Sequence, residues 1–264
     1  MRKLIRLLRS QKVNILKTLI FNLRALPFKQ AIKFPIYIYS DTKIISIGKI
    51  FIESDNIHKG MIRIGKRNFF AGFKTQFINS GEIHFKGKFL VETGTCINNT
   101  GTMILGKESR FCERCNILIV DKLSIGVSTQ IAFETVIMDT DFHTIVNTNK
   151  GIAKKSYGEI KIGSYNWIGN RSMIKKGTIT DDYTIVSSLS MLNKDYRGEE
   201  KYPLIAGCPA KIISYGWRRI YNYDNGYMIH SFFKNTGVET YKVENSENID
   251  WDEYCLHGDE NLKF

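Results

Sequence analysis

Apolar side chains recur every six residues through the middle of the chain. One row steps from Ile125 to Ile131, Ile137 and His143. A second row starts at Ile162 and continues through Ile168, Ile174, Thr180, Val186 and Leu192. An α-helix repeats every 3.6 residues and a strand every two, so neither accounts for this period. The period predicts a β-coil over residues 120–195, in which the backbone turns a corner every few residues.

Glycine supports the same interpretation. Aliphatic-glycine pairs begin at Ile47, Ile64, Leu105, Ile125, Ile162 and Ile168. A sharply turning coil needs positions without Cβ crowding, and glycine provides them. From residue 36 onward the chain is rich in Ile, Phe and Gly, which makes long helices improbable. The earlier rows, Leu105-Phe111-Ile117 and Ile64-Phe70, are short, which predicts irregular N-terminal coils.

One polar segment interrupts the frame. Residues 144–158, TIVNTNKGIAKKSYG, separate the two regular rows and directly follow His143. A lysine-bearing insertion between regular runs is best interpreted as a loop that leaves the coil, and such loops often shape binding sites.

The first 35 residues have a different pattern. Apolar residues recur at roughly helical spacing among Lys and Arg, which predicts a basic amphipathic helix. Its apolar positions are Leu4, Leu7, Leu8, Ile15, Leu16, Leu19 and Leu23. Two interpretations stay open: the apolar face packs on the rest of the protein, or residues 1–25 contact a membrane surface.

Charge is unevenly distributed along the 264 residues. The formal net charge is +12, yet residues 1–40 hold nine Lys or Arg and no acid, whereas residues 239–264 hold eight acids and two lysines. The stretch between them is also basic. Such a body attracts anionic partners, including nucleotides, coenzyme A, acidic glycans and phospholipids. The sequence holds no RNA- or DNA-binding signature, so we expect no nucleic-acid partner.

The cysteines favour a reducing compartment. Five cysteines are an odd number without the dense spacing of a disulfide scaffold, which predicts a cytoplasmic protein. The N-terminal segment lacks both an apolar run long enough to span a bilayer and the small-residue cleavage pattern of a secretory signal.

Three motifs occur in a fixed order: DTDFH at 139–143, a run containing Asn-Trp-Ile-Gly within 159–195, and AGCPAKII at 206–213. In this combination, residues 60–215 resemble the hexapeptide-repeat acyltransferases. They are most similar to galactoside and maltose acetyltransferases and to bacterial enzymes that acetylate capsule, exopolysaccharide or lipopolysaccharide sugars. The resemblance implies an all-β fold with a left-handed parallel β-helix, a homotrimer, and active sites between subunits that use acetyl-CoA.

The predicted organisation has three parts: a basic helical segment at 1–35, the β-helix domain at 36–215 with its loop at 144–158, and a C-terminal extension with an acidic tail at 216–264. The extension lies outside the resemblance.

His143 is the candidate catalytic base. A sugar hydroxyl attacks a thioester only if its proton is removed in the transition state, and imidazole suits that task near neutral pH. Asp141, or less favourably Asp139, could orient the imidazole by accepting a hydrogen bond from its other nitrogen. Both aspartates could instead solvate a turn, and Asp139 is also a candidate for binding sugar hydroxyls. His58, His84, His230 and His257 are interpreted as structural.

The resemblance carries further residues into the predicted site. Trp167 would line the acceptor and coenzyme channel, and Asn116 is a weaker acceptor-site candidate. Ser187 and Ser188 would lie along the pantetheine arm, and Lys194 and Lys211 would face the phosphates. The family's usual Gly-Ala-Gly-Ser turn appears here as Ser187-Ser188-Leu189-Ser190, which places the individual coenzyme contacts in doubt.

No metal is expected. Cys112 and Cys115 form a CxxC without a second pair or a nearby HxxxH, so they are interpreted as structural. A zinc-binding β-helix, as in γ-class carbonic anhydrases, needs several histidines, and the regular run holds one. The leading hypothesis is O-acetylation of a surface-polysaccharide sugar by a cytoplasmic enzyme. The alternatives are N-acetylation of a nucleotide-linked amino sugar and a non-catalytic trimeric scaffold.

Overall fold

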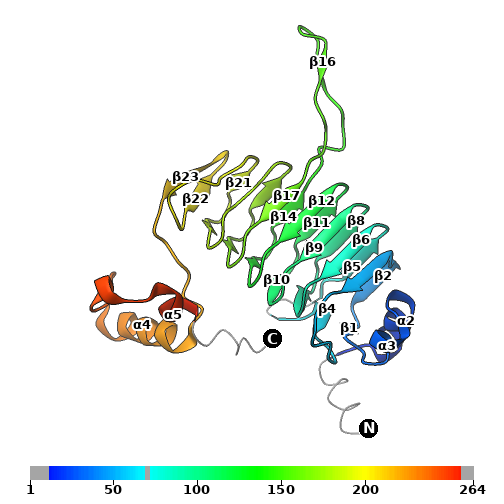
Figure 1. The fold of residues 1–264 in the computed structure, drawn as a ribbon, viewed down its shortest axis with the longest axis horizontal. Coiled ribbons are helices and arrows are strands. Elements are labelled where there is room, and N and C mark those ends of the chain that lie inside the picture. Colours follow the sequence, from blue (N-terminus) through cyan, green and yellow to red (C-terminus); the bar gives the residue numbers. More distant parts are fainter. Residues whose placement is uncertain (1–11, 69–71, 257–264) are drawn as a thin grey trace. The chain divides into compact units, whose positions relative to one another are not determined.

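The computed structural model describes residues 12–68 and 72–256. Its central feature is a stack of β-coils whose strands form three parallel sheets (Figure 1). The nine-stranded sheet comprises β1 (Ile36–Ile38), β4 (Ile62–Lys66), β7 (Phe89–Glu92), β10 (Ser109–Phe111), β13 (Gln130–Ile131), β18 (Trp167–Ile168), β20 (Ile185–Val186), β22 (Leu204–Gly207) and the antiparallel β23 (Ala210–Ser214).

The other two sheets complete each coil. The seven-stranded sheet holds β2 (Thr42–Ser46), β5 (Thr75–Asn79), β8 (Cys96–Asn99), β11 (Asn116–Ile119), β14 (Val136–Met138), β19 (Met173–Lys175) and β21 (Met191–Leu192). The five-stranded sheet holds β3 (Lys49–Ile52), β6 (Glu82–Phe85), β9 (Thr102–Leu105), β12 (Lys122–Ile125) and β17 (Ile160–Ile162). The chain visits the three sheets in turn, which makes a three-sided parallel β-helix. The predicted all-β, β-helical fold class is confirmed.

The predicted rows form the core. Ile125, Ile131 and Ile137 are buried, and so is every member of the row that starts at Ile162. The expectation of irregular N-terminal coils is largely wrong. Ile97 pairs with Ile117, and Ile117 with Ile137, which gives regular coils of 20 residues (117 − 97). Only the coils after residue 160 repeat at 18 residues, as in the pairing of Ile168 with Val186 (186 − 168). A step of six therefore detects the later coils and loses the frame in the earlier ones.

Glycine is needed where successive coils approach each other. A Cβ atom on Gly106 would lie 2.2 Å from the carbonyl oxygen of Gly126, and one on Gly126 would lie 2.4 Å from the backbone nitrogen of Ser164. Both contacts are with backbone, which cannot rotate away. The predicted reason for the aliphatic-glycine pairs is therefore confirmed at this corner.

The polar insertion forms an arm. Between β14 and β17 the chain leaves the prism as an antiparallel hairpin made of β15 (Val146–Asn147) and β16 (Ile152–Ala153) (Figure 1). Its apolar side chains stay exposed, among them Phe142, Ile145, Val146 and Ile152.

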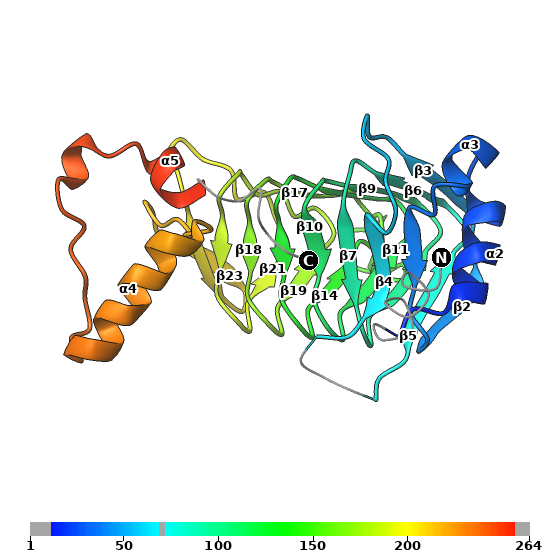
Figure 2. The ribbon, with the colours of Figure 1, turned by 90° about the horizontal axis from the view of Figure 1, so that it is seen from below.

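Helices α2 (Ile15–Ala25) and α3 (Phe28–Ala31) lie at the N-terminal end of the prism (Figure 2). The face of α2 that packs on the prism comprises Thr18, Phe21 and Asn22, whereas Leu16, Leu19 and Leu23 are exposed. The interpretation that the apolar face predicted from the sequence packs on the protein is thus wrong for the described residues. Leu4, Leu7 and Leu8 lie outside the described residues.

Polar side chains fasten α2 to the free edge of β1. The Asn22 amide donates to the carbonyl of Ile36 at 2.7 Å and accepts from the Ile36 N–H at 3.1 Å. The Thr18 hydroxyl accepts from the Ile38 N–H at 3.0 Å. An exposed sheet edge leaves backbone groups without partners, so these contacts cap the first strand of the sheet.

Replacing Asn22 with leucine is expected to destabilise the protein by about 2–3 kcal/mol, because two buried backbone groups of Ile36 lose their partners. Urea unfolding measures the change. Leu23→Ala on the exposed side of α2 is the control and should shift stability by less than about 0.5 kcal/mol. Equal effects of the two substitutions would contradict the capping role.

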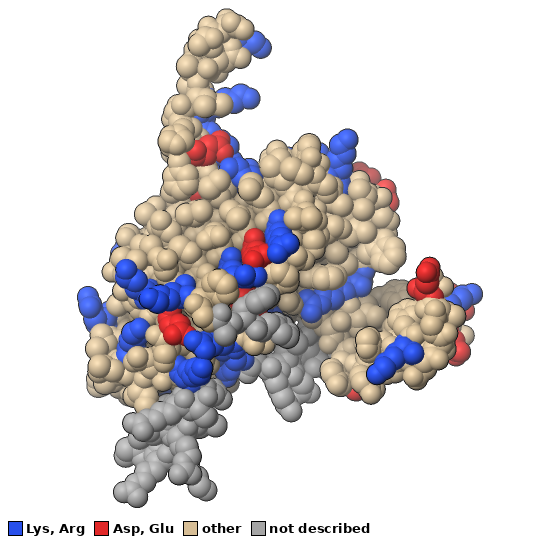
Figure 3. Space-filling model, turned by 180° about the vertical axis from the view of Figure 1, so that it is seen from behind, with Lys and Arg blue, Asp and Glu red and all other residues tan. Residues whose placement is uncertain are grey.

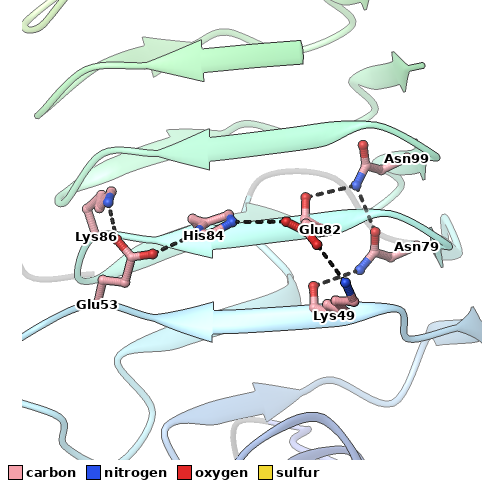
Figure 4. A network of polar contacts seen from close by, with 7 residues as sticks. All are labelled: Lys49, Glu53, Asn79, Glu82, His84, Lys86 and Asn99. Carbon is pink, nitrogen blue, oxygen red and sulfur yellow. Dashed lines mark hydrogen bonds and ion pairs between the residues drawn. The ribbon is translucent and has the colours of Figure 1, made fainter. Parts of the chain in front are cut away.

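The outer face of the five-stranded sheet carries a charged network (Figure 4). His84 lies between Glu53, at 2.5 Å from Nδ1, and Glu82, at 3.6 Å from Nε2, while Lys49 binds Glu82 and Lys86 binds Glu53. The imidazole also stacks on Phe51. The structural role expected for His84 fits these contacts.

Two carboxyl groups are buried where the nine-stranded sheet turns into the seven-stranded sheet. Glu92 and Glu113 are 2% and 1% exposed. Burial and the nearby charge of Glu113 raise the pKa of Glu92 to about 7, although Arg110 and Lys66 oppose the shift. Between about pH 4.5 and pH 7 the folded state therefore keeps a proton that the unfolded chain has released, and stability falls as pH rises through this window.

Replacing Glu92 with glutamine should remove that fall. We expect the variant to gain about 3 kcal/mol relative to wild type between pH 5 and pH 8, measured by urea unfolding at both values. Glu134→Gln is a control of opposite sign, because a hydrogen bond from Arg171 lowers the pKa of Glu134. Parallel pH profiles for wild type and the Glu92 variant would contradict the prediction.

Residues 218–264 form a separate compact unit. It contains α4 (Tyr223–Thr236), the 3-10 helix η1 (Ser246–Asn248) and α5 (Trp251–Leu256). Asn222 caps α4, whose C-terminal end is closed by Gly237 in the left-handed conformation. Within this unit Arg218 pairs with Asp252 at 2.6 Å, and the Asn225 amide donates to the Tyr254 carbonyl. Of the helices in the described part of the chain, none combines the length and hydropathy of a bilayer-spanning segment.

Candidate functional site

His143 lies at the base of the arm. The arm leaves the prism at the edge between the seven-stranded and five-stranded sheets, after β14 and before β17. The backbone N–H of His143 donates to the Asp141 carbonyl at 2.7 Å, which closes a tight turn around Phe142. The histidine itself is exposed. Of the two orientations open to the sequence row, the structure has the outward one, which leaves the imidazole accessible to a substrate.

Asp141 anchors this turn to the next coil. Its carboxylate pairs with Lys175 at 3.3 Å and with Lys176 at 2.5 Å, and these contacts lower its pKa. Its backbone N–H donates to the Ser156 carbonyl at 2.7 Å, on the returning side of the arm. The carboxylate therefore faces the lysines, and no hydrogen bond between it and the His143 imidazole is present among the described residues.

The sequence prediction missed Lys175 and Lys176. Lys175 lies beside Met138 in the register of β14 and β19, and the Lys176 ammonium also donates to the Lys155 carbonyl at 2.8 Å. Two cations thus lie at the base of the arm, next to the turn that holds His143. The six-residue frame could have placed both on this edge if the length of the insertion had been known.

Asp139 has a structural role. It is fully buried, and its two oxygens accept the backbone N–H groups of Val120 and Asp121 at 2.9 and 2.8 Å. Burial raises its pKa, although these hydrogen bonds oppose the shift. The expectation that Asp139 binds sugar hydroxyls or orients His143 is wrong, because its carboxylate is directed into the preceding coil. The alternative, that it satisfies a turn, fits.

Trp167 lies on another side of the prism. It is 41% exposed on β18, between Gln130 and Ile185 in the nine-stranded sheet. The nine-stranded sheet is the side opposite the edge that carries His143, because a three-sided prism has one face opposite each edge. A single chain therefore does not bring Trp167 and His143 together.

The remaining predicted residues are spread over the surface. Ser187 and Ser188 lie where the nine-stranded sheet turns into the seven-stranded sheet, and the Ser188 hydroxyl donates to Asn170 at 2.6 Å. Leu189 follows in the left-handed conformation, with φ of 61°. Asn116 is exposed at the start of β11, on the outer face of the seven-stranded sheet.

The two predicted phosphate-binding lysines differ in position. Lys194 follows β21 on the same edge as His143, two coils further along, with its ammonium 5.4 Å from the ring centre of Tyr196. Lys211 is exposed on β23, at the end of the nine-stranded sheet. Lys176 and Lys194 therefore form a line of cations along the edge that carries His143.

The cysteine pair is buried. Cys112 and Cys115 are free thiols, and burial raises the pKa of Cys112 to about 12 and that of Cys115 well above its usual value. The Cys115 thiol donates to the Ala132 carbonyl at 3.2 Å. In residues 12–68 and 72–256, no group of three or more His, Cys, Asp or Glu side chains is arranged to hold a metal ion.

No protein-family model matches the chain, and no curated protein matches it. Solved structures do. The polySia-specific acetyltransferase NeuO is 18% identical over 79% of this chain and 91% of its own, with a TM-score of 0.37. The polysialic acid O-acetyltransferase OatWY is 21% identical over 72% of this chain and 95% of its own, with a TM-score of 0.40. AntD, an N-acyltransferase from Bacillus cereus crystallised with dTDP and 3-hydroxybutyryl-CoA, is 14% identical over 77% of this chain and 89% of its own, with a TM-score of 0.42. The solved structures to which this chain is similar are thus acyltransferases.

Proposed function

We propose that the chain is an acetyl-CoA-dependent O-acetyltransferase that acts on a sugar hydroxyl of a surface polysaccharide or its precursor. The observation that carries this proposal is the placement of His143: an outward-facing imidazole on a tight turn, held beside a line of cations at the edge of a β-helix. The motif order that resembles hexapeptide-repeat acyltransferases supports the same class.

In the proposed reaction, the His143 imidazole accepts the proton of the sugar hydroxyl as the oxygen attacks the thioester carbonyl. The new C–O bond forms and the C–S bond breaks, and the proton passes to the departing thiolate. Acetyl-CoA supplies the activated acyl group. Asp141 acts as a positioning residue, because its ion pairs with Lys175 and Lys176 hold the turn that presents His143.

The coenzyme is proposed to lie along the edge that carries His143. Lys176 and Lys194 lie on this edge, and the phosphates of coenzyme A require cations. Ser187, Ser188 and Lys211 lie elsewhere on the same chain. Their proposed contacts with the pantetheine arm and the phosphates therefore belong to a site that a neighbouring copy completes.

We propose a homotrimer for the same reason. His143 and Trp167 lie on different sides of one prism, so a site containing both needs two copies of the chain. The arm also extends away from its own prism with Phe142, Ile145 and Ile152 exposed, which suits contact with a neighbouring copy (Figure 1). The proposed location is the cytoplasm, where acetyl-CoA and sugar precursors are available, and at the inner face of the membrane.

Thiol release from acetyl-CoA tests the proposal. Wild-type protein is incubated with a panel of neutral sugars, acidic glycan fragments and nucleotide-linked amino sugars. Release that depends on a hydroxyl acceptor, with an ester in the product, supports O-acetylation. Release only with amino sugars, with an amide in the product, assigns the N-acetyltransferase alternative. No acceptor-dependent release with any member of the panel would contradict an acetyltransferase function.

A further inference from the structure

An apolar helix face is uncovered at the N-terminal end of the prism. Five apolar side chains of α2 are between 38% and 65% exposed: Ile15, Leu16, Leu19, Ile20 and Leu23. Beyond α2, Phe28 is 72% exposed at the start of α3, and Ile32 is 52% exposed directly after it. Soluble proteins expose single apolar side chains commonly, but a contiguous row along one helix indicates an interaction surface.

The helix cannot turn this row inward. Thr18, Phe21 and Asn22 occupy the opposite side of α2, and Asn22 is fixed to both backbone groups of Ile36. At 100° per residue, residues 15, 16, 19, 20 and 23 share one face, and residues 18, 21, 22 and 25 share the other. The packing that caps the β1 edge therefore holds the apolar row outward.

The surroundings of this row are basic. Residues 1–40 contain no acid, and Lys12, Arg24, Lys29 and Lys33 are exposed. The Lys17 ammonium donates to the Ser40 and Thr42 carbonyls at 3.2 and 2.7 Å and is already engaged. Lys and Arg also outnumber the acids over the N-terminal coils on the face seen in Figure 3.

We propose that α2 and α3 dock on the surface of an anionic lipid bilayer. An amphipathic helix with an apolar face and flanking cations lies in the plane of the interface, its apolar side chains among the acyl chains and its cations at the headgroups. A second copy of the chain fits less well, because two such surfaces would place like charges opposite each other. Docking by this surface would hold the enzyme where surface glycans are assembled, and the inference does not depend on the acceptor.

The test is co-sedimentation of full-length protein with vesicles. Wild type is expected to bind vesicles of phosphatidylglycerol and phosphatidylcholine at least about tenfold more strongly than pure phosphatidylcholine vesicles, and to lose most of this difference in 0.5 M NaCl. The double variant Leu16→Glu, Leu23→Glu should bind the anionic vesicles at least about tenfold more weakly than wild type. Both substituted side chains are exposed and Glu is a good helix former, so the fold should be kept.

A matched control carries the same change of charge elsewhere. Val120 and Ile213 are exposed apolar residues of other strands and turns, so Val120→Glu, Ile213→Glu should bind like wild type. Equal binding by the two double variants, or equal binding of wild type to both kinds of vesicle, would overturn the proposal. A fall in molar mass of the Leu16, Leu23 variant without lipid would also overturn it, because the row would then be a contact between copies. Thiol release with a soluble acceptor should be unchanged, which separates this test from that of the proposed function.

Discussion

Replacing His143 with alanine is expected to lower kcat for acetyl transfer by about 10²–10⁴-fold, with little change in KM for acetyl-CoA. The proposed role of the imidazole is proton removal in the transition state, and substrate binding depends mainly on other groups. His143 is exposed on a turn that its backbone holds, so the substitution should leave the fold intact. Steady-state thiol release with the best acceptor measures kcat and KM, and thermal unfolding checks the fold.

His58→Ala is the matched control. His58 is a partly exposed histidine whose Nδ1 lies 3.3 Å from the neighbouring Lys59 carbonyl, far along the chain from the arm. We expect the control to retain wild-type kcat. If His143→Ala and His58→Ala were equally active with every acceptor that the wild type uses, His143 would not be the base. The scaffold alternative would gain if the wild type were itself inactive.

Replacing Gly126 with alanine is expected to destabilise the protein by about 4 kcal/mol, a large effect for one methyl group. The added Cβ atom would lie 2.4 Å from the Ser164 nitrogen and 2.6 Å from the Gly163 carbon of the next coil. Those atoms belong to backbone held by the β12–β17 pairing, so relief requires two coils to move apart. Urea unfolding measures the loss.

Gly198→Ala separates this crowding from a general glycine effect. A Cβ atom on Gly198 would meet nothing within 4 Å, and its φ is not in the left-handed region. The control should therefore change stability by less than about 1 kcal/mol, and in the stabilising direction if its native conformation suits alanine. Similar losses for Gly126→Ala and Gly198→Ala would show that the approach of the coils does not set the requirement for glycine.

The sequence predicted the β-helix because burial on three faces leaves a linear trace. Each coil directs a side chain inward at a regular step, so Ile162, Ile168 and Ile174 can be recognised without coordinates. The N-terminal coils escaped this step because their longer repeat is not a multiple of six, as the pairing of Ile97 with Ile117 shows. A search at a period of 20 residues would have found them.

The partners of the candidate site depended on contacts between coils. Asp139 and Asp141 are two residues apart, yet one carboxylate is buried under the preceding coil and the other faces Lys175 and Lys176 of the next. Alternation along an extended backbone predicts that the two side chains point the same way. The chain turns out of the prism between them, and sequence spacing does not record that turn.

The sequence by itself determined the coil architecture, the glycine corners, the position of the arm and the exposed histidine as the candidate base, because each depends on local spacing. Only the tertiary structure decided which carboxylate could reach His143, that Trp167 lies on another side of the prism, and which side of α2 packs. Thr18 and Asn22 bury a polar side of that helix because the free edge of β1 offers unpaired backbone groups. The apolar row therefore stays outside, a result that hydrophobicity along the chain cannot predict because the competing partner is a strand edge formed later in the sequence.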